Sequence, residues 1–238
     1  MNHVLSVHID YAGYSDKEPI IKDIRFSIKS GEWVGLIGGN GAGKSTTINT
    51  VLGLLKHHKS AIHFGGQNGH YGYVAEQPIF YDELTLWEHM KLAAAAFEMK
   101  KDTYAEKAEE LLHAFRMAHV KHELPQHFSK GMQQKLMLIL AFLVEADVYI
   151  FDEPFVGLDP QATQTLLEYI DKACQRGAGV LMSTHILDTA EKVCDRFVLL
   201  DQGRLIAQGT LTDIRQQAGL SQGSLYECFD RLQGRECV

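Results

Sequence analysis

A glycine-rich stretch near the N-terminus has the residue types and the spacing of a phosphate-binding loop. The segment "GGNGAGKST" matches the pattern G-x-x-x-x-G-K-[S/T]. Glycines let backbone N–H groups close around a triphosphate, Lys44 reaches its β- and γ-phosphates, and Ser45 offers a hydroxyl to Mg²⁺. The alternative is a glycine-rich turn without a ligand. The predicted nucleotide-binding residues are Gly38, Gly39, Asn40, Gly41, Ala42, Gly43, Lys44, Ser45 and Thr46.

Two adjacent carboxylates follow a second apolar run. In "VYIFDEP", Asp152 and Glu153 stand at the end of a segment that reads as a buried strand. Ligands of open α/β sheets bind outside the carboxyl ends of the strands, so Asp152 is predicted to hold Mg²⁺. Because side chains alternate along a strand, Glu153 turns elsewhere and is free to polarise a water. The alternative for two acids here is a helix N-cap or a surface turn.

Both motifs need strands before them and helices after them, and the flanking sequence supplies these. "WVGLIG" and "GVLMSTH" are short apolar runs typical of buried strands, and "KSTTINTVLGLL" is helical. Ile24, Phe26 and Ile28 alternate with polar residues, and residues 1–10 also alternate like a strand. "RFVLLDQGRLIAQG" predicts a hairpin that turns at residues 201–203. Strands that alternate with helices predict a mostly parallel sheet with helices on both faces.

The middle of the chain is predicted to be helical. Capping boxes are expected at Thr85 with Glu88 and at Thr103 with Glu106. Asp159-Pro160 reads as the start of a helix that ends at Gly177.

The segment "FSKGMQQK", residues 128–135, reads as the first turn of a buried helix, since an apolar run follows it at 136–144. A helix start exposes unpaired N–H groups and a partial positive charge, and therefore attracts anions. A lysine at this position is unfavourable unless a negative group lies nearby.

Composition restricts the function classes. The chain has 238 residues and a formal net charge of −7, which makes it a poor candidate for sequence-independent nucleic-acid binding. The longest apolar run has nine residues, too few to span a bilayer, so a soluble protein is expected whose membrane role would need a partner. With no secretory signal expected, Cys174, Cys194, Cys228 and Cys237 are predicted to be reduced cytosolic thiols.

Taken in order, these motifs resemble those of the ATP-binding subunits of ABC transporters, over nearly the whole chain. Gln77 in "YGYVAEQPIFYDE" matches the family's Q-loop, and "FSKGM" matches its signature motif. "GLDP", residues 157–160, matches the D-loop, and His185 matches the switch histidine. "GSLYECFDRL" resembles a short helical motif that follows many such cassettes.

The resemblance implies roles for individual residues. Glu153, His185 and Gln77 are expected to be catalytic, with Ser45, Gln77 and Asp152 around Mg²⁺. Ser129 and Gly131 of the signature are expected to contact nucleotide. Tyr14 resembles the aromatic residue that stacks on adenine, although Tyr11 is an alternative. The signature departs from the usual Leu-Ser-Gly-Gly-Gln, since Lys130 replaces its first glycine and Met132 its glutamine. Lys130 is expected to face solvent, with a contact to nucleotide as the alternative.

The resemblance also implies a fold: an α/β P-loop NTPase core with a mostly parallel sheet, an N-terminal antiparallel β-subdomain and an inserted α-helical subdomain. The expected parts are a core at 1–79 and 148–215, the helical subdomain at 80–147 and a short tail at 216–238. "FSKGM" together with "FDEPFVGLDP" is most similar to Ecs-type subunits, bacterial ABC ATPases that serve a separate membrane protein.

The implied function is MgATP hydrolysis by a homodimer that drives a transmembrane permease. In this family the signature of one chain faces the γ-phosphate held by the other, so the anion expected near Ser129 is the ATP of a second copy. The subunit is then cytoplasmic and peripheral on the inner face of the membrane, without a nucleic-acid partner. The alternatives are a soluble ABC ATPase acting on cytosolic machinery and an inactive cassette that senses ATP. An exposed apolar groove for the permease is expected near Ile79, Phe80, Leu84 and Trp87, unless these residues pack internally.

Overall fold

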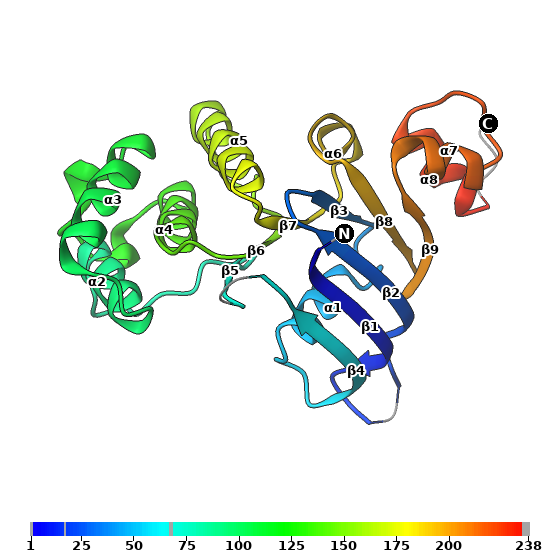
Figure 1. The fold of residues 1–238 in the computed structure, drawn as a ribbon, viewed down its shortest axis with the longest axis horizontal. Coiled ribbons are helices and arrows are strands. Elements are labelled where there is room, and N and C mark those ends of the chain that lie inside the picture. Colours follow the sequence, from blue (N-terminus) through cyan, green and yellow to red (C-terminus); the bar gives the residue numbers. More distant parts are fainter. Residues whose placement is uncertain (1, 17, 67–68, 235–238) are drawn as a thin grey trace.

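The computed structural model describes residues 2–16, 18–66 and 69–234 and arranges them as two sheets with helices around them (Figure 1). The larger sheet has the strand order β5-β6-β7-β3-β8-β9. Strands β5 to β8 pair in parallel, and β9 pairs antiparallel with β8 at one edge, so the predicted mostly parallel sheet is confirmed. The strands are β3 (Trp33–Ile37), β5 (Tyr71–Val74), β6 (Val148–Asp152), β7 (Gly179–Thr184), β8 (Arg196–Asp201) and β9 (Arg204–Gly209).

The smaller sheet is antiparallel, in the order β2-β1-β4, as expected for the N-terminal subdomain. Its strands are β1 (His3–Gly13), β2 (Ile21–Lys29) and β4 (His57–Phe64). The alternation predicted for β2 is confirmed, because Ile24, Phe26 and Ile28 are buried. The strand predicted over residues 1–10 is β1, although Met1 lies outside the described residues.

Helices cover both faces of the larger sheet, as predicted. Helix α1 (Lys44–Val51) packs between the two sheets, where its Ile48 shares a core cluster with Leu181 of β7. The neighbouring Val180 and Met182 belong to a different cluster with α5 (Pro160–Gln175), since successive side chains of a strand point to opposite faces. Helices α6 (Leu187–Val193), α7 (Leu211–Gln217) and α8 (Leu225–Leu232) complete the layer on the α5 side (Figure 1).

The helical group that lies at the left of Figure 1 is inserted between β5 and β6. It comprises α2 (Leu86–Ala96), α3 (Lys101–Ala114) and α4 (Lys130–Leu143), with short 3₁₀ turns η1 (Ala118–Val120) and η2 (Pro125–His127). This is the interval in which the helical subdomain was expected. The predicted boundary between core and tail at residues 215/216, in contrast, falls within α7.

Most of the predicted helix boundaries are confirmed, although the segment predicted to be helical over residues 44–55 ends as a helix at Val51. The capping box at Thr85 and Glu88 is present, Asp159 caps α5, and the chain leaves α5 through Gly177 with φ +97°. The capping box at Thr103 and Glu106 is wrong. Helix α3 already begins at Lys101, with Lys100 as its N-cap and no side-chain cap, so Thr103 lies inside its first turn and the N–H groups of the helix are not capped by this pair.

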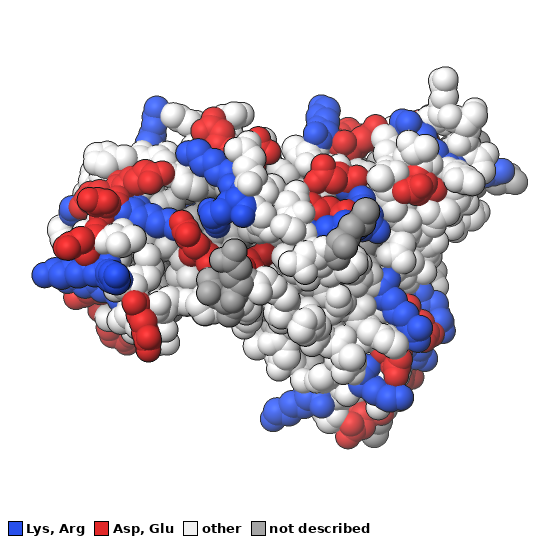
Figure 2. Space-filling model, in the orientation of Figure 1, with Lys and Arg blue, Asp and Glu red and all other residues white. Residues whose placement is uncertain are grey.

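The structure bears on three expectations that were drawn from the composition. Within the described ranges, no helix is long and apolar enough to cross a membrane. Basic and acidic side chains are intermixed on the face shown in Figure 2, without a broad field of one sign. Cys174, Cys194 and Cys228 are free thiols, while Cys237 lies outside the described residues.

Candidate nucleotide site

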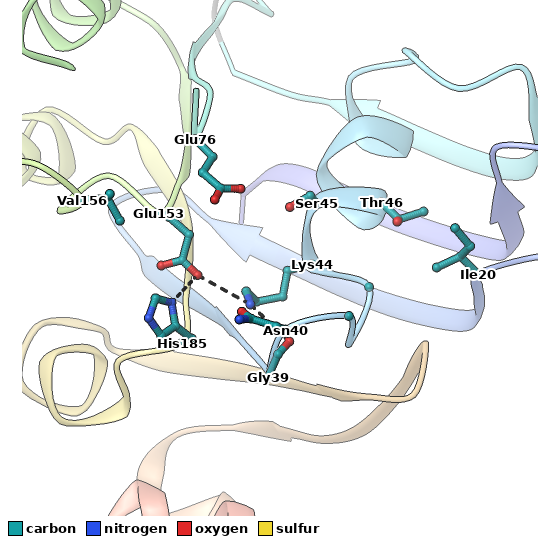
Figure 3. A pocket seen from close by; sticks show the side chains of 12 residues that line it. Ile20, Gly39, Asn40, Lys44, Ser45, Thr46, Glu76, Glu153, Val156 and His185 are labelled. Carbon is teal, nitrogen blue, oxygen red and sulfur yellow. Dashed lines mark hydrogen bonds and ion pairs between the residues drawn. The ribbon is translucent and has the colours of Figure 1, made fainter. Parts of the chain in front are cut away.

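A cavity of about 630 Å³ opens where the phosphate-loop residues meet the ends of β6 and β7 (Figure 3). It brings together most of the residues predicted to bind phosphate with two of the three predicted catalytic residues. Gly38 and Ala42 are the phosphate-loop positions that lie outside its lining. The lining residues are Ile20, Gly39, Asn40, Gly41, Gly43, Lys44, Ser45, Thr46, Glu76, Glu153, Val156 and His185.

The loop delivers the start of α1 to this cavity. Gly43 is the N-cap residue and has φ +104°, a conformation that disfavours any residue with a side chain. A Cβ at this position would also lie 2.5 Å from Ile21 Cγ2. No side chain caps the helix, so its first N–H groups remain open to an anion. Open N–H groups and the helix dipole together make a phosphate site.

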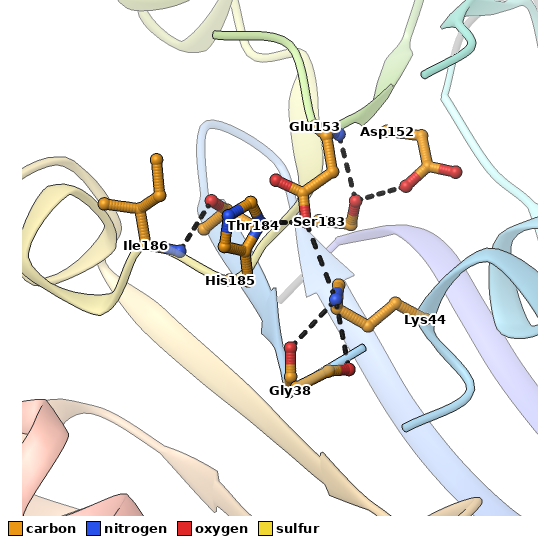
Figure 4. Close-up of polar contacts among 9 residues, drawn as sticks. Gly38, Lys44, Asp152, Glu153, Ser183, Thr184, His185 and Ile186 are labelled. Carbon is orange, nitrogen blue, oxygen red and sulfur yellow. Dashed lines mark hydrogen bonds and ion pairs between the residues drawn. The ribbon is translucent and has the colours of Figure 1, made fainter. Parts of the chain in front are cut away.

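Lys44 is a buried cation at the floor of the cavity, with its side chain 8% exposed. Its Nζ donates to the carbonyl oxygen of Gly38 at 2.8 Å and lies 3.5 Å from Glu153 Oε1 (Figure 4). A buried charge needs partners, and these oxygens supply them. The ammonium group is therefore held in position between the phosphate loop and the carboxylate.

Glu153 links the cavity to His185. Its Oε1 lies 2.9 Å from His185 Nδ1 (Figure 3). Since a carboxylate can only accept, Nδ1 carries the proton and Nε2 is left for another partner. Glu153 itself has φ +51°, in the left-handed region that costs about 1–3 kcal/mol outside glycine. Its N–H donates to the carbonyl and hydroxyl oxygens of Ser183, at 3.2 and 3.1 Å, which holds this backbone in place.

Asp152 is buried, and its carboxylate and that of Glu153 point in different directions (Figure 4). The predicted strand alternation is not the cause, because Glu153 lies beyond the end of β6 in the left-handed region. Asp152 Oδ1 accepts a short hydrogen bond from the Ser183 hydroxyl (Figure 4). The described residues contain no group of three or more His, Cys, Asp or Glu that could hold a metal alone. Mg²⁺ normally takes one or two protein oxygens and completes its shell with phosphates and water, so one carboxylate and the Ser45 hydroxyl fit its chemistry.

Sequence reasoning missed Ser183 and Glu76. Ser183 pairs directly with Asp152 across β6 and β7, so its register was the signal that could have revealed it. At the Q-loop, Gln77 is exposed and lies outside the cavity lining, whereas its neighbour Glu76 lines the cavity. Nothing in the sequence distinguished these two loop residues.

The two candidate adenine-stacking tyrosines have different surroundings. Tyr14 is 60% exposed, and its hydroxyl accepts a hydrogen bond of 3.3 Å from Asn49 on α1. Tyr11 lines a separate cavity with Lys56 and His57. Tyr14 therefore lies beside the helix that follows the phosphate loop, and its ring is open to stacking.

The signature residues lie outside this cavity. Ser129 is the N-cap of α4, where its hydroxyl accepts from the Met132 N–H at 3.3 Å. Lys130 is exposed, in agreement with the favoured expectation. Gly131 packs against the D-loop backbone, because a Cβ there would lie 2.5 Å from the carbonyl oxygen of Gly157. The chain thus presents Ser129 and Lys130 at a second place, away from its own phosphate loop.

Helix α4 is also tied to the segment that follows Glu153. Lys135 Nζ lies 2.6 Å from Asp159 Oδ2, and Gln134 Nε2 donates to the carbonyl oxygen of Pro154 at 3.4 Å. The hydrogen bond from Lys135, followed by the Ala162 N–H, lowers the pKa of Asp159. The start of α4 and the D-loop therefore form one packed unit.

Comparisons with known proteins agree with this geometry. The ABC transporter family profile matches residues 21–156. The chain is 48% identical over 229 residues to the uncharacterised ABC transporter ATP-binding protein YthP of Bacillus subtilis (strain 168), covering 96% of each chain. It is 44% identical to the ABC-type transporter ATP-binding protein EcsA of the same organism, again over 96% of each.

A solved structure of an ATP-binding subunit of an ABC transporter superimposes with a TM-score of 0.91 at 44% identity, covering 97% of this chain and 99% of the other. The predicted P-loop NTPase fold and the similarity to Ecs-type subunits are therefore confirmed. The chain belongs to the family of ABC transporter ATP-binding subunits.

Proposed function

We propose that this chain hydrolyses MgATP in the cavity at residues 38–46 and uses the energy to drive a membrane-embedded partner. The single observation that carries the proposal is the linked set of Lys44, Glu153 and His185 beside the open start of α1. These groups form one connected arrangement in a cavity of sufficient size for phosphates. An inactive cassette would not require a carboxylate held at the cavity by a strained backbone.

The roles proposed for Lys44, Ser45, Glu153 and His185 follow from their positions in the cavity lining, whereas those of Asp152, Gln77 and Tyr14 come from the family resemblance. Lys44 and the N–H groups of α1 neutralise the phosphates, and Ser45, Asp152 and Gln77 are proposed to hold Mg²⁺, which offsets negative charge on the phosphate oxygens. Glu153 orients and polarises the attacking water. His185, whose Nδ1 contacts Glu153, is proposed to meet the γ-phosphate through Nε2. Tyr14 stacks on adenine.

The separate location of the signature supports action as a dimer of two copies. Ser129 and Gly131 lie outside the cavity lining, so a second chain is needed to bring them to nucleotide. Head-to-tail pairing would place the start of α4 against the ATP of the other chain, where the positive end of a helix favours the γ-phosphate. ATP then holds the two chains together, and hydrolysis separates them.

The partner is proposed to be a transmembrane permease, which agrees with the description of YthP and EcsA as ATP-binding proteins of ABC transporters. The docking surface is proposed near Gln77. There, Ile79 is 68% exposed and Tyr81 60% exposed. Phe80 and Trp87 instead pack against the core of the helical group, so the internal-packing alternative holds in part for these two residues. The subunit is then peripheral on the cytoplasmic face of the membrane.

A soluble ABC ATPase that serves cytosolic machinery is the second candidate, and co-purification distinguishes the two. We expect a tagged full-length chain to recover one integral membrane protein from detergent-solubilised membranes. Ile79→Asp should lower that recovery while the purified subunit keeps its phosphate-release rate, because Ile79 is exposed. Leu54→Asp, at another exposed apolar position (63%), is the matched control. Recovery of cytosolic machinery alone would favour the second candidate, and absence of ATP-dependent phosphate release would overturn the enzymatic assignment.

A further inference from the structure

The C-terminal helix α8 is firmly docked, with a buried face and an exposed face. Leu225, Cys228 and Phe229 are buried, whereas Tyr226 is 58% exposed. The buried positions recur three and four residues apart, which is one face of a helix. A capping box at Ser224 and Glu227 fixes where the helix begins. This part of the chain is therefore an ordered element of the core and not a loose appendage.

The buried face of α8 packs behind both segments that supply the nucleotide site. Its core cluster includes Ile37, the last residue of β3 and the direct neighbour of Gly38. The same cluster contains Ala190 of α6, the short helix that follows His185. The residue before the phosphate loop and the helix after the switch histidine, which are far apart in sequence, thus share one apolar cluster with the buried face of α8.

Two polar contacts connect α8 to the same two segments. The N–H of Leu225 donates to Glu191 Oε2 on α6 at 2.6 Å. At the other end, Gln233 Nε2 donates to Asp201 Oδ1 at 2.7 Å. Asp201 enters the β8–β9 turn, and the N–H of Gly203 in that turn donates to the carbonyl oxygen of Ala42 in the phosphate loop at 3.1 Å.

We infer that α8 positions the nucleotide site from behind, through two separable contacts. Through its hydrogen bond from the Leu225 N–H, Glu191 fixes α6 to α8. Helix α6 follows the segment 184–186, which carries His185 and is closed by the hydrogen bond from the Ile186 N–H to Thr184 Oγ1. Gln233 holds the turn that supports Ala42. Both are positioning residues, because neither lies in the cavity lining. This inference rests on the proposed ATP hydrolysis, since its kinetic consequence is expressed in that reaction.

The two contacts should have different kinetic signatures. Glu191→Ala should lower kcat by about three- to tenfold with KM for ATP nearly unchanged, because His185 acts on the reacting phosphate. Glu191→Gln keeps an oxygen that accepts from Leu225, and should restore the parental kcat. Gln233→Ala should instead raise KM by about threefold, because the phosphate loop contributes to binding.

A structural measurement keeps the test independent of turnover. Phe229→Ala and Tyr226→Ala remove aromatic rings three residues apart on α8, one buried and one exposed. We expect amide hydrogen exchange of the full-length chain to accelerate in residues 186–193 and 200–203 for Phe229→Ala, and to stay parental for Tyr226→Ala. If the parent chain shows no hydrolysis, the proposed function fails while the exchange result still tests the docking of α8.

The inference would be overturned by equal exchange in the two aromatic variants. It would also be overturned if Glu191→Ala and Gln233→Ala lowered the melting temperature but left both kcat and KM within twofold of the parent well below that temperature. That result would assign α8 a purely stabilising role.

Discussion

The phosphate loop and the start of α4 both present helix N-termini to solvent, yet they are built differently. At the phosphate loop, the acting side chains contact one another within the chain: Lys44 and His185 both reach Glu153. At α4, Ser129 caps its own helix and Lys130 is exposed. Behind them, the backbone of Gly131 packs against Gly157. The side chains of the phosphate-loop site contact one another within the chain, whereas the start of α4 is held by backbone packing and its polar side chains face solvent.

This difference leads to separate expectations for nucleotide binding and for the second copy. Because Lys44 and His185 both contact Glu153 within the chain, we expect the phosphate-loop site to bind nucleotide in a single chain. On the proposed function, the exposed start of α4 contributes only when it meets the nucleotide of a second copy. Because α4 is tied to Pro154 and Asp159, we expect that contact to influence the segment next to Glu153.

We expect the strongest effect from a substitution in the phosphate loop. Lys44→Ala should weaken ATP binding by a hundredfold or more, on the order of 3 kcal/mol, because the phosphates lose a buried cation. Equilibrium binding of a fluorescent ATP analogue measures this loss. Lys56→Ala, at an exposed lysine nearby in sequence, is the control and should bind normally. Parental affinity in Lys44→Ala would contradict the assignment of the loop.

Next in size, Glu153→Gln should separate chemistry from binding. The amide keeps the shape of the side chain but cannot act as a base, so phosphate release should fall by roughly 10²- to 10⁴-fold while ATP binding persists. Glu76→Gln changes the other carboxylate of the lining and should retain most turnover. Normal steady-state turnover in Glu153→Gln, with no MgATP-dependent dimer on size exclusion, would exclude this role.

A smaller effect is expected from disturbing the packing between the start of α4, which carries the signature, and the D-loop. In Gly131→Ala, the added Cβ would meet the Gly157 carbonyl, and relieving that contact should lower the free energy of unfolding by roughly 1–3 kcal/mol. Chemical denaturation measures the loss, and Lys130→Ala at the exposed neighbour should cost little. Equal free energies of unfolding for the two variants would show that the close contact between α4 and the D-loop does not contribute to stability.

The smallest effect concerns the reactivity of two thiols, Cys174 and Cys194. Burial raises the pKa of the Cys174 thiol to about 12 and also raises the pKa of Cys194. Both thiols should therefore react much more slowly with iodoacetamide at pH 8 than the same cysteines in the unfolded chain. Because the folded-state pKa values are raised, the associated stability is complete below about pH 9 and is lost as pH rises beyond it. Peptide mapping that found rapid labelling of Cys174 would contradict this burial.

Local sequence signals predicted most of the scaffold. Buried strands such as 33–37 are continuous apolar runs, and the starts at Thr85 and Asp159 carry their own caps. The capping pattern at Thr103 failed because α3 begins two residues earlier, at Lys101, without any side-chain cap. A helix that starts without a cap leaves no local signal for its first residue.

The site was less predictable where it depends on distant contacts. The phosphate loop was readable because its glycines, lysine and serine are contiguous. Ser183 and Glu76 were not, because one depends on the register between β6 and β7 and the other on the path of a loop. The docking of α8 behind the site also depends on tertiary packing, which no short pattern encodes.

The start of α4 is proposed to contact the nucleotide of another chain. This proposal can be tested by mixing two variants, Lys44→Ala, which lacks the phosphate-loop cation, and Ser129→Arg, which places a bulky cation at the signature. In each homodimer both composite sites carry one lesion. In a heterodimer with contacts between chains, one site collects both lesions and the other is intact. The measurement is the amount of ATP trapped per dimer after subunit exchange has been verified.

We expect trapping, absent in either variant alone, to return on mixing and to approach one nucleotide per heterodimer. Trapping is preferred to turnover because a single intact site need not complete the cycle. No recovery despite confirmed exchange would mean that Ser129 does not meet the nucleotide of the other chain, and the proposed head-to-tail pairing would be wrong.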